Sequence, residues 1–67
     1  ESNWQRLSTR ELEVLGLVSV GLISKQIADK LFISVNTVNN HRQKILEKLR
    51  ASNTNEAVTY AKNLGLI

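Results

Sequence analysis

Apolar residues recur every three or four positions through most of the chain, and this spacing predicts α-helices. No stretch with a period of two survives inspection, so no strand is predicted. The expected helices cover residues 9–20, 24–31, 35–49 and 54–64. The sequence therefore predicts one all-α, four-helix domain.

Polar residues mark the expected helix starts, and glycines mark two of the ends. Ser8 and Glu11 have the spacing of a capping box, in which each residue binds the other's backbone amide. Gly21 is expected to end the first helix, since glycine adopts the left-handed conformation without a steric penalty. The remaining expected signals are caps at Ser24 and Ser34, a second capping box over 53–56, and a stop at Gly65 followed by Leu66 and Ile67 folded back on the helix.

Residues 1–7 show no clear periodicity and are expected to form an arm or linker. Trp4 and Leu7 are expected to dock this arm on the body, and residues 8–67 to form the domain. Because the chain begins at Glu1 rather than Met, we interpret it as a piece of a longer protein whose upstream regulatory domain is missing.

Composition limits what such a small domain can be. The chain has 67 residues, 42% of them hydrophobic, a net charge of +3, no cysteine and one histidine. It can form one small core, but neither a disulfide nor a metal site, and no cofactor is expected. No apolar run is long enough to span a membrane, and the basic excess weakly favours an acidic partner.

The third expected helix has two chemically different sides. At 100° per residue, Val38, Ile45 and Leu49 lie on one side, together with Val35 and Leu46. The opposite side carries mostly carboxamides: Asn36, Asn39, Asn40 and Gln43, together with Glu47. Asparagine is a poor helix former, so this cluster indicates a purpose other than helix stability.

A short helix, a three-residue turn and a longer helix form the helix-turn-helix plan. Carboxamides both donate and accept hydrogen bonds, which suits base edges in the DNA major groove. Cations and hydroxyls around this side would bind phosphates without reading sequence. From the residues alone these are Ser24, Lys25, Thr37, Lys44, Lys48 and Arg50. Lys30 remains ambiguous, and Arg42 is expected to extend along the apolar stripe.

Several segments resemble the LuxR/NarL family of bacterial DNA-binding regulators. They are LSTRELEVL (7–15), Gly21, IADKL (27–31), ISVNTVNNH (33–41) and ILEKL (45–49). The resemblance covers residues 7–66 and implies a winged-helix-like fold with a three-helix core and a C-terminal dimerisation helix. It further implies the output domain of a bacterial transcription regulator, often a response regulator.

The resemblance also implies roles for individual residues. By this reading Asn39, Asn40 and Gln43 contact bases, while Thr37, His41 and Lys48 lie near the DNA backbone. Val58, Tyr60 and Ala61 are assigned to a homodimer through the fourth helix, which would bind an inverted repeat. This sequence departs from the family at three positions: Asn39 stands where lysine is usual, Thr54 where arginine is common, and Glu47 where a basic residue is frequent.

Other interpretations remain open at this point. His41 could be a half-buried packing residue, and the amide cluster could be solvated surface. Region 4 of a sigma factor shares part of the pattern, and a helical protein-interaction module is the alternative from another class. An enzyme is disfavoured, because no nucleophile–base pair or glycine-rich phosphate loop is present. Double-stranded DNA is the expected partner, with RNA polymerase as a further candidate, in the cytoplasm.

Overall fold

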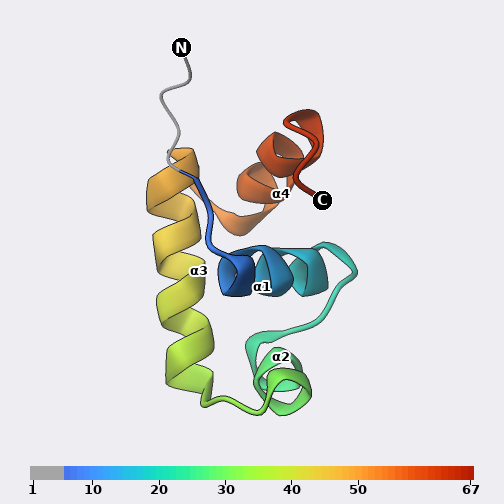
Figure 1. Cartoon of the computed structure of the whole chain (residues 1–67), viewed down its shortest axis with the longest axis vertical. Helices are drawn as coiled ribbons and strands as arrows, with labels where there is room; N and C mark the ends of the chain where they lie inside the picture. Colours follow the sequence, from blue (N-terminus) through green and yellow to red (C-terminus); the bar gives the residue numbers. More distant parts are fainter. Residues whose placement is uncertain (1–5) are drawn as a thin grey trace.

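The computed structural model describes residues 6–67, which fold into four helices with no strand among them. The helices are α1 (Thr9–Ser19), α2 (Ser24–Leu31), α3 (Val35–Leu49) and α4 (Thr54–Asn63). In Figure 1, α3 runs along one side of the molecule, α1 crosses beside it, and α2 and α4 lie toward its opposite ends. The all-α prediction is confirmed, and every predicted helix boundary is within one residue of the observed one.

The predicted capping boxes are formed to different degrees. Ser8 Oγ accepts the Glu11 amide at 3.1 Å, and the Ser8 amide donates to Glu11 Oε1 at 2.8 Å, so the first box is complete. At α4, Asn53 Oδ1 accepts the Glu56 amide at 2.9 Å, as predicted. The Glu56 carboxylate, however, binds the amide of Ser52 at 2.8 Å rather than that of Asn53. The second box is therefore only half as predicted.

The cap of α2 was predicted one residue too late. Ile23 precedes the helix in extended conformation, and its amide donates to Gln26 Oε1 at 2.9 Å. Because Gln26 binds this amide, the Ser24 hydroxyl is not needed as a cap and makes contacts with α3 instead. Ser34 does cap α3 as predicted, since its Oγ accepts the Thr37 amide at 3.0 Å.

Every helix is followed within two residues by a residue in the left-handed conformation. Gly21 (φ 99°) and Gly65 (φ 76°) occupy this conformation after α1 and α4, as the sequence predicts. Phe32 (φ 59°) and Arg50 (φ 55°) occupy it after α2 and α3, where no glycine is available. The backbone of these two residues adopts a conformation that costs a residue other than glycine about 1–2 kcal/mol.

Phe32→Gly is therefore expected to raise the free energy of unfolding by about 0.5–1 kcal/mol. The substitution removes the left-handed penalty, and the greater freedom of glycine in the unfolded chain offsets part of that gain. Little packing is lost, because the Phe32 side chain is 94% exposed. Urea denaturation followed by circular dichroism measures the change, and a lower midpoint for the variant would contradict it.

The helices meet around one small core, in which α3 contacts each of the other three. Its buried apolar members are Leu7, Val14, Leu15, Ile27, Ala28, Val38, Ile45, Leu49, Ala57 and Ala61. Leu7 thus docks on the body as predicted, whereas Trp4 lies outside the described residues. Val35 was assigned to the apolar side of the third helix but is 41% exposed, because it stands at the first position of α3, beyond the core.

Candidate nucleic-acid interface

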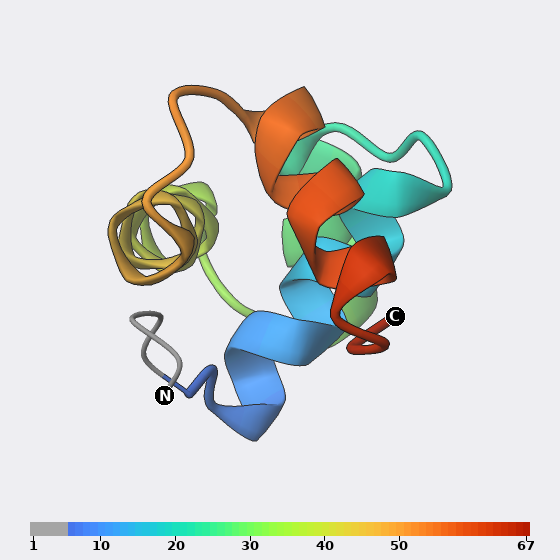
Figure 2. The ribbon, with the colours of Figure 1, turned by 90° about the horizontal axis from the view of Figure 1, so that it is seen from above.

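One side of α3 is buried in the core, and the other is left uncovered. Val38, Ile45 and Leu49 are at most 5% exposed and face the other helices. Viewed along its axis in Figure 2, α3 stands at the edge of the molecule with no helix on its outer side. The exposed carboxamides on α3 are Asn36, Asn39, Asn40 and Gln43, and we name this set the amide face.

The fold brings together the three residues predicted to contact bases, but their hydrogen bonds differ. No hydrogen bond among residues 6–67 involves the Asn40 side chain, so its donors and acceptor are all available. Gln43 Nε2 donates to Glu47 Oε2 at 3.4 Å, a long contact between two exposed side chains. Asn39 Oδ1 accepts a hydrogen bond from Ser24 Oγ at 2.9 Å. Asn39 is therefore tied to α2, while Asn40 is not restrained in this way.

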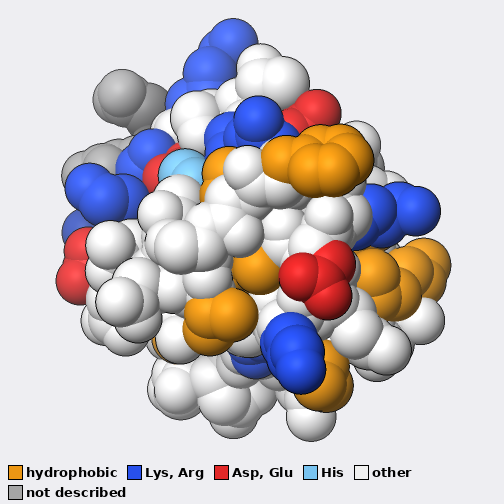
Figure 3. Space-filling model, turned by 90° about the horizontal axis from the view of Figure 1, so that it is seen from below, with side chains coloured by type: hydrophobic (Ala, Val, Ile, Leu, Met, Phe, Trp, Pro, Cys, Tyr) orange, Lys and Arg blue, Asp and Glu red, His pale blue; other side chains and the backbone are white. Residues whose placement is uncertain are grey.

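Exposed cations lie near the start of α3 and along its length as far as its C-terminal end. Lys25 in α2, Lys44 in α3 and Arg50 after α3 are all exposed, as phosphate-binding residues must be. Figure 3 shows the face around α2 and the start of α3, where Lys and Arg side chains lie around uncharged ones rather than in one block. This distribution suits contacts with separate phosphates beside a neutral, base-reading surface.

Lys48 differs from the other predicted phosphate ligands. Its Nζ lies 2.7 Å from Glu11 Oε1, with the Lys48 side chain 24% exposed and that of Glu11 only 4%. Burial raises the pKa of Glu11, but hydrogen bonds from Lys48 and Ser8 and the charge of Lys48 outweigh it and lower the pKa overall. The Lys48 ammonium thus neutralises a buried carboxylate and fastens α3 to the start of α1.

Arg42 joins three helices through its guanidinium. Nη1 donates to Ser24 Oγ at 3.0 Å, and Nη2 donates to Thr54 Oγ1 at 3.1 Å. The side chain also borders a small apolar hollow lined by Leu15, Val18, Ile45, Leu46 and Ala57. The predicted extension along the apolar stripe fits this position, but the polar contacts with Ser24 and Thr54 could not be read from the sequence.

Thr37 and His41, the other residues predicted near the DNA backbone, are both half-buried. Thr37 Oγ1 lies 2.9 Å from Ser34 Oγ at the first turn of α3. His41 Nδ1 is buried and has no hydrogen-bond partner among residues 6–67. Only part of the His41 ring therefore reaches the surface on which Thr37 also lies.

The three residues assigned to a dimer interface lie at different depths in α4. Ala61 is fully buried in the core of this chain, and Val58 is half-buried against it. Tyr60 is 38% exposed and, with Leu49, Asn63 and Leu64, lines a shallow apolar hollow. Tyr60 and its neighbours on this hollow are thus available to a partner, whereas Ala61 is not.

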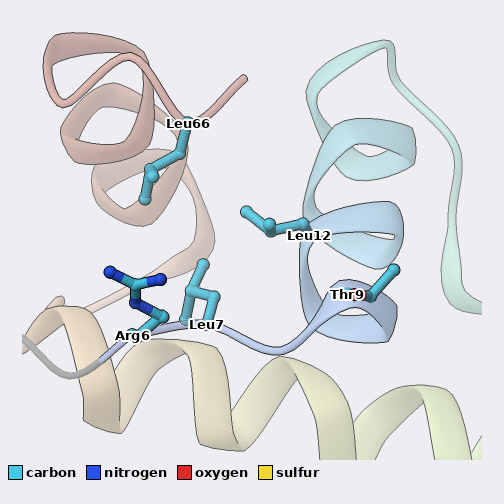
Figure 4. A pocket seen from close by; sticks show the side chains of 5 residues that line it. All are labelled: Arg6, Leu7, Thr9, Leu12 and Leu66. Atoms are coloured by element: carbon cyan, nitrogen blue, oxygen red, sulfur yellow. The ribbon is translucent and has the colours of Figure 1, made fainter.

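A further surface hollow lies between α1 and the end of the chain. Figure 4 shows Leu7, Leu12 and Leu66 directed toward it, with Arg6 and Thr9 at its border. None of the residues described in the structure forms a cluster of three or more metal-ligating side chains. Over the same residues no helix has the length and apolar character needed to cross a bilayer. The amide face remains the surface with the most distinctive chemistry.

Comparison with known proteins agrees with this geometry. The sequence pattern of the GerE family, described as bacterial regulatory proteins of the luxR family, matches residues 5–61. This chain belongs to the LuxR family. The LuxR-family domain is 49% identical over 55 residues to the oxygen regulatory protein NreC of Staphylococcus carnosus (strain TM300), and equally to that of Staphylococcus aureus (strain JH9). Both alignments cover 82% of this chain but only 25% of the relative.

A solved structure shows the same arrangement of helices. The response regulator ChrA of a heme-sensing two-component system matches with a TM-score of 0.90 and 42% sequence identity, over 98% of this chain and 33% of ChrA. The resemblance read from the sequence and the four-helix, helix-turn-helix fold are thereby confirmed. The LuxR family consists of regulatory proteins and is not an enzyme class, and the match favours it over region 4 of sigma factors.

Proposed function

We propose that this domain binds double-stranded DNA in a sequence-specific manner, with α3 in the major groove. The observation that carries the proposal is the amide face, which stands uncovered on α3 directly opposite the buried Val38, Ile45 and Leu49. Asn39, Asn40 and Gln43 contact base edges, and Asn40 is the freest to make a bidentate contact with adenine. This docking uses the first half of the recognition helix, where these residues lie.

Phosphate contacts hold the helix in place. In this proposal Lys25, Lys44 and Arg50 bind phosphates through their charges, and Thr37 and His41 contribute polar groups beside them. Lys48 and Ser24, which the sequence also suggested, have partners inside the domain. Lys48 therefore acts mainly by fixing the orientation of α3 rather than by binding a phosphate.

The biological setting follows from the relatives. Because the chain spans a quarter of NreC and a third of ChrA, we propose that it is the output domain, residues 8–67, of a longer bacterial response regulator. Such a protein would work in the cytoplasm, with RNA polymerase as a further partner. Two copies would pair through Tyr60, Leu64 and the edge of Val58 on α4, and so place their recognition helices on an inverted repeat about one DNA turn apart.

The proposal is tested by selecting duplexes from a random library and titrating the enriched and random pools at two salt concentrations. We expect salt-dependent binding to both pools, tighter binding to the enriched one, and two domains per enriched duplex. Asn40→Ala and Gln43→Ala should each weaken binding to the enriched duplex about 5- to 100-fold, with the salt dependence unchanged. Lys44→Ala should weaken both pools alike and reduce the salt slope by about one.

The matched control is Asn55→Ala, which removes an exposed carboxamide from α4 rather than α3. This variant should bind as the wild type does. The proposal fails if no pool shows salt-dependent binding, or if Asn55→Ala weakens binding as strongly as Asn40→Ala does.

A further inference from the structure

A chain of hydrogen bonds connects α4 to the amide face through α3 and α2. Thr54 Oγ1 accepts from Arg42 Nη2 at 3.1 Å, and Ser24 Oγ accepts from Arg42 Nη1 at 3.0 Å. Ser24 Oγ in turn contacts Asn39 Oδ1 at 2.9 Å. Ser24, Arg42 and Thr54 are all partly buried, and only Asn39 at the end of the chain is exposed. These three partly buried residues therefore determine which atoms of the Asn39 amide are available to a ligand.

The direction of each hydrogen bond follows from the chemistry of arginine. A guanidinium has donors and no acceptor, so Ser24 Oγ must accept from Arg42. The Ser24 hydroxyl has a single proton, which is then left to donate to Asn39. In the structure this proton goes to Asn39 Oδ1 at 2.9 Å, so the Asn39 carbonyl oxygen faces Ser24 and its NH2 group points away. The charge-assisted bond from Arg42 favours this arrangement, because it occupies an acceptor site of Ser24 Oγ and leaves the hydroxyl proton for Asn39.

We propose that Ser24 and Arg42 are positioning residues that make Asn39 a hydrogen-bond donor toward the DNA, so that it selects guanine. In the major groove, guanine offers two adjacent acceptors, O6 and N7, whereas adenine and thymine offer one each, N7 and O4, and cytosine offers an amino donor. Adenine recognition by an asparagine needs the amide oxygen and nitrogen on the same base edge. The hydrogen bond from Ser24 holds the Asn39 oxygen away from that edge. Asn39 thus differs from Asn40, whose amide no neighbour among residues 6–67 restrains.

This inference rests on the proposed function and is tested on the same selected operator. The base pair read by Asn39 is the one whose preference disappears in the Asn39→Ala variant. At that base pair the wild type should favour guanine over adenine by on the order of tenfold, and should discriminate against cytosine more strongly. A wild-type preference for any base other than guanine at that base pair would overturn the inference.

Variants of the positioning residues test the chain directly. Ser24→Ala removes the donor to Asn39, and Arg42→Met removes the group that fixes the Ser24 proton while keeping an apolar stem. In both variants the Asn39 amide can turn over, so the guanine-to-adenine ratio should fall to within about threefold of one. Ser24→Thr keeps the hydroxyl, so this variant should retain the wild-type guanine-to-adenine ratio. The matched control is Ser52→Ala, whose side chain makes none of the hydrogen bonds seen among residues 6–67.

The readout separates positioning from other effects. Loss of a phosphate contact or of overall stability lowers affinity for all sequences alike, whereas the inference requires a change at one base pair. Thermal unfolding of each variant shows whether it is folded, and the wild-type guanine preference can be measured even if one variant is not. An unchanged ratio in folded Ser24→Ala and Arg42→Met would overturn the inference. Specific binding without any effect of Asn39→Ala would overturn it too and leave the proposed function intact. No specific binding by the wild type would overturn both.

Discussion

Lys48→Met is expected to lower the free energy of unfolding at pH 7 by about 2–3 kcal/mol. The substitution leaves the Glu11 carboxylate buried, with only the Ser8 amide and no cation to neutralise it. Breaking a fully buried ion pair costs about 3–5 kcal/mol, and the partial exposure of Lys48 reduces that figure. Urea denaturation followed by circular dichroism at pH 7 measures the loss.

The same ion pair should make stability depend on pH. Because the folded state lowers the pKa of Glu11 below its ordinary value of 4.5, the stabilisation from Glu11 is present above that pH and is lost as the pH falls through the folded pKa. The urea concentration at the denaturation midpoint of the wild type should therefore decrease as the pH is lowered below about 4.5. Glu11→Gln should reduce this dependence of stability on pH.

The matched control is Glu13→Gln, because Glu13 forms an exposed ion pair with Arg10 at 3.2 Å. Exposed ion pairs contribute little to the free energy of unfolding, so this variant should change it by about 0.5 kcal/mol or less. Equal effects of Glu11→Gln and Glu13→Gln would show that burial of the Glu11–Lys48 pair does not matter.

Ile45→Ala is expected to lower the free energy of unfolding by about 3 kcal/mol. Ile45 is 2% exposed on the buried side of α3, and its truncation leaves a cavity between the helices. The total stability of a domain this size is on the order of 3–10 kcal/mol, so the loss is a large share of it and should raise the unfolded-to-folded ratio on the order of a hundredfold. Thermal denaturation by circular dichroism measures the effect.

Operator DNA should restore most of the stability that the Ile45→Ala variant loses. A duplex at one hundred times its Kd adds about 2.7 kcal/mol to the folded state. Lys44→Ala, at the neighbouring exposed position, should keep the wild-type stability and lose DNA affinity instead. If Ile45→Ala unfolds at the wild-type temperature, then α3 does not hold the core together as the structure indicates.

Local signals explain why the helices could be predicted so closely. A capping box joins residues three positions apart, and a left-handed glycine ends the helix directly before it. Ser8 and Gly21 can therefore be recognised from the neighbouring sequence alone. Ser24 was misassigned because a serine and the following Gln26 can both supply a cap, and only the fold decides between them. Phe32 shows the opposite limit, since a left-handed phenylalanine has no distinctive local pattern.

The amide face could also be predicted, because all its members lie on one helix and helical periodicity is enough to group them. The contacts that modify it could not. Lys48 is 37 residues from Glu11, and Arg42 is 18 residues from Ser24, so neither pair shares a local pattern. Polar and charged residues that the sequence assigned to one surface were divided by the fold between exposed positions and internal partners.

The short connections between the helices also affect how the domain folds. Only residues 20–23, 32–34 and 50–53 separate one helix from the next. Closing such short loops loses little chain entropy, and most contacts join segments that are near in sequence. Helical domains of this kind reach the folded state in microseconds to milliseconds. A domain with such short connections can thus open and refold quickly, which limits the time that its core is exposed to proteases.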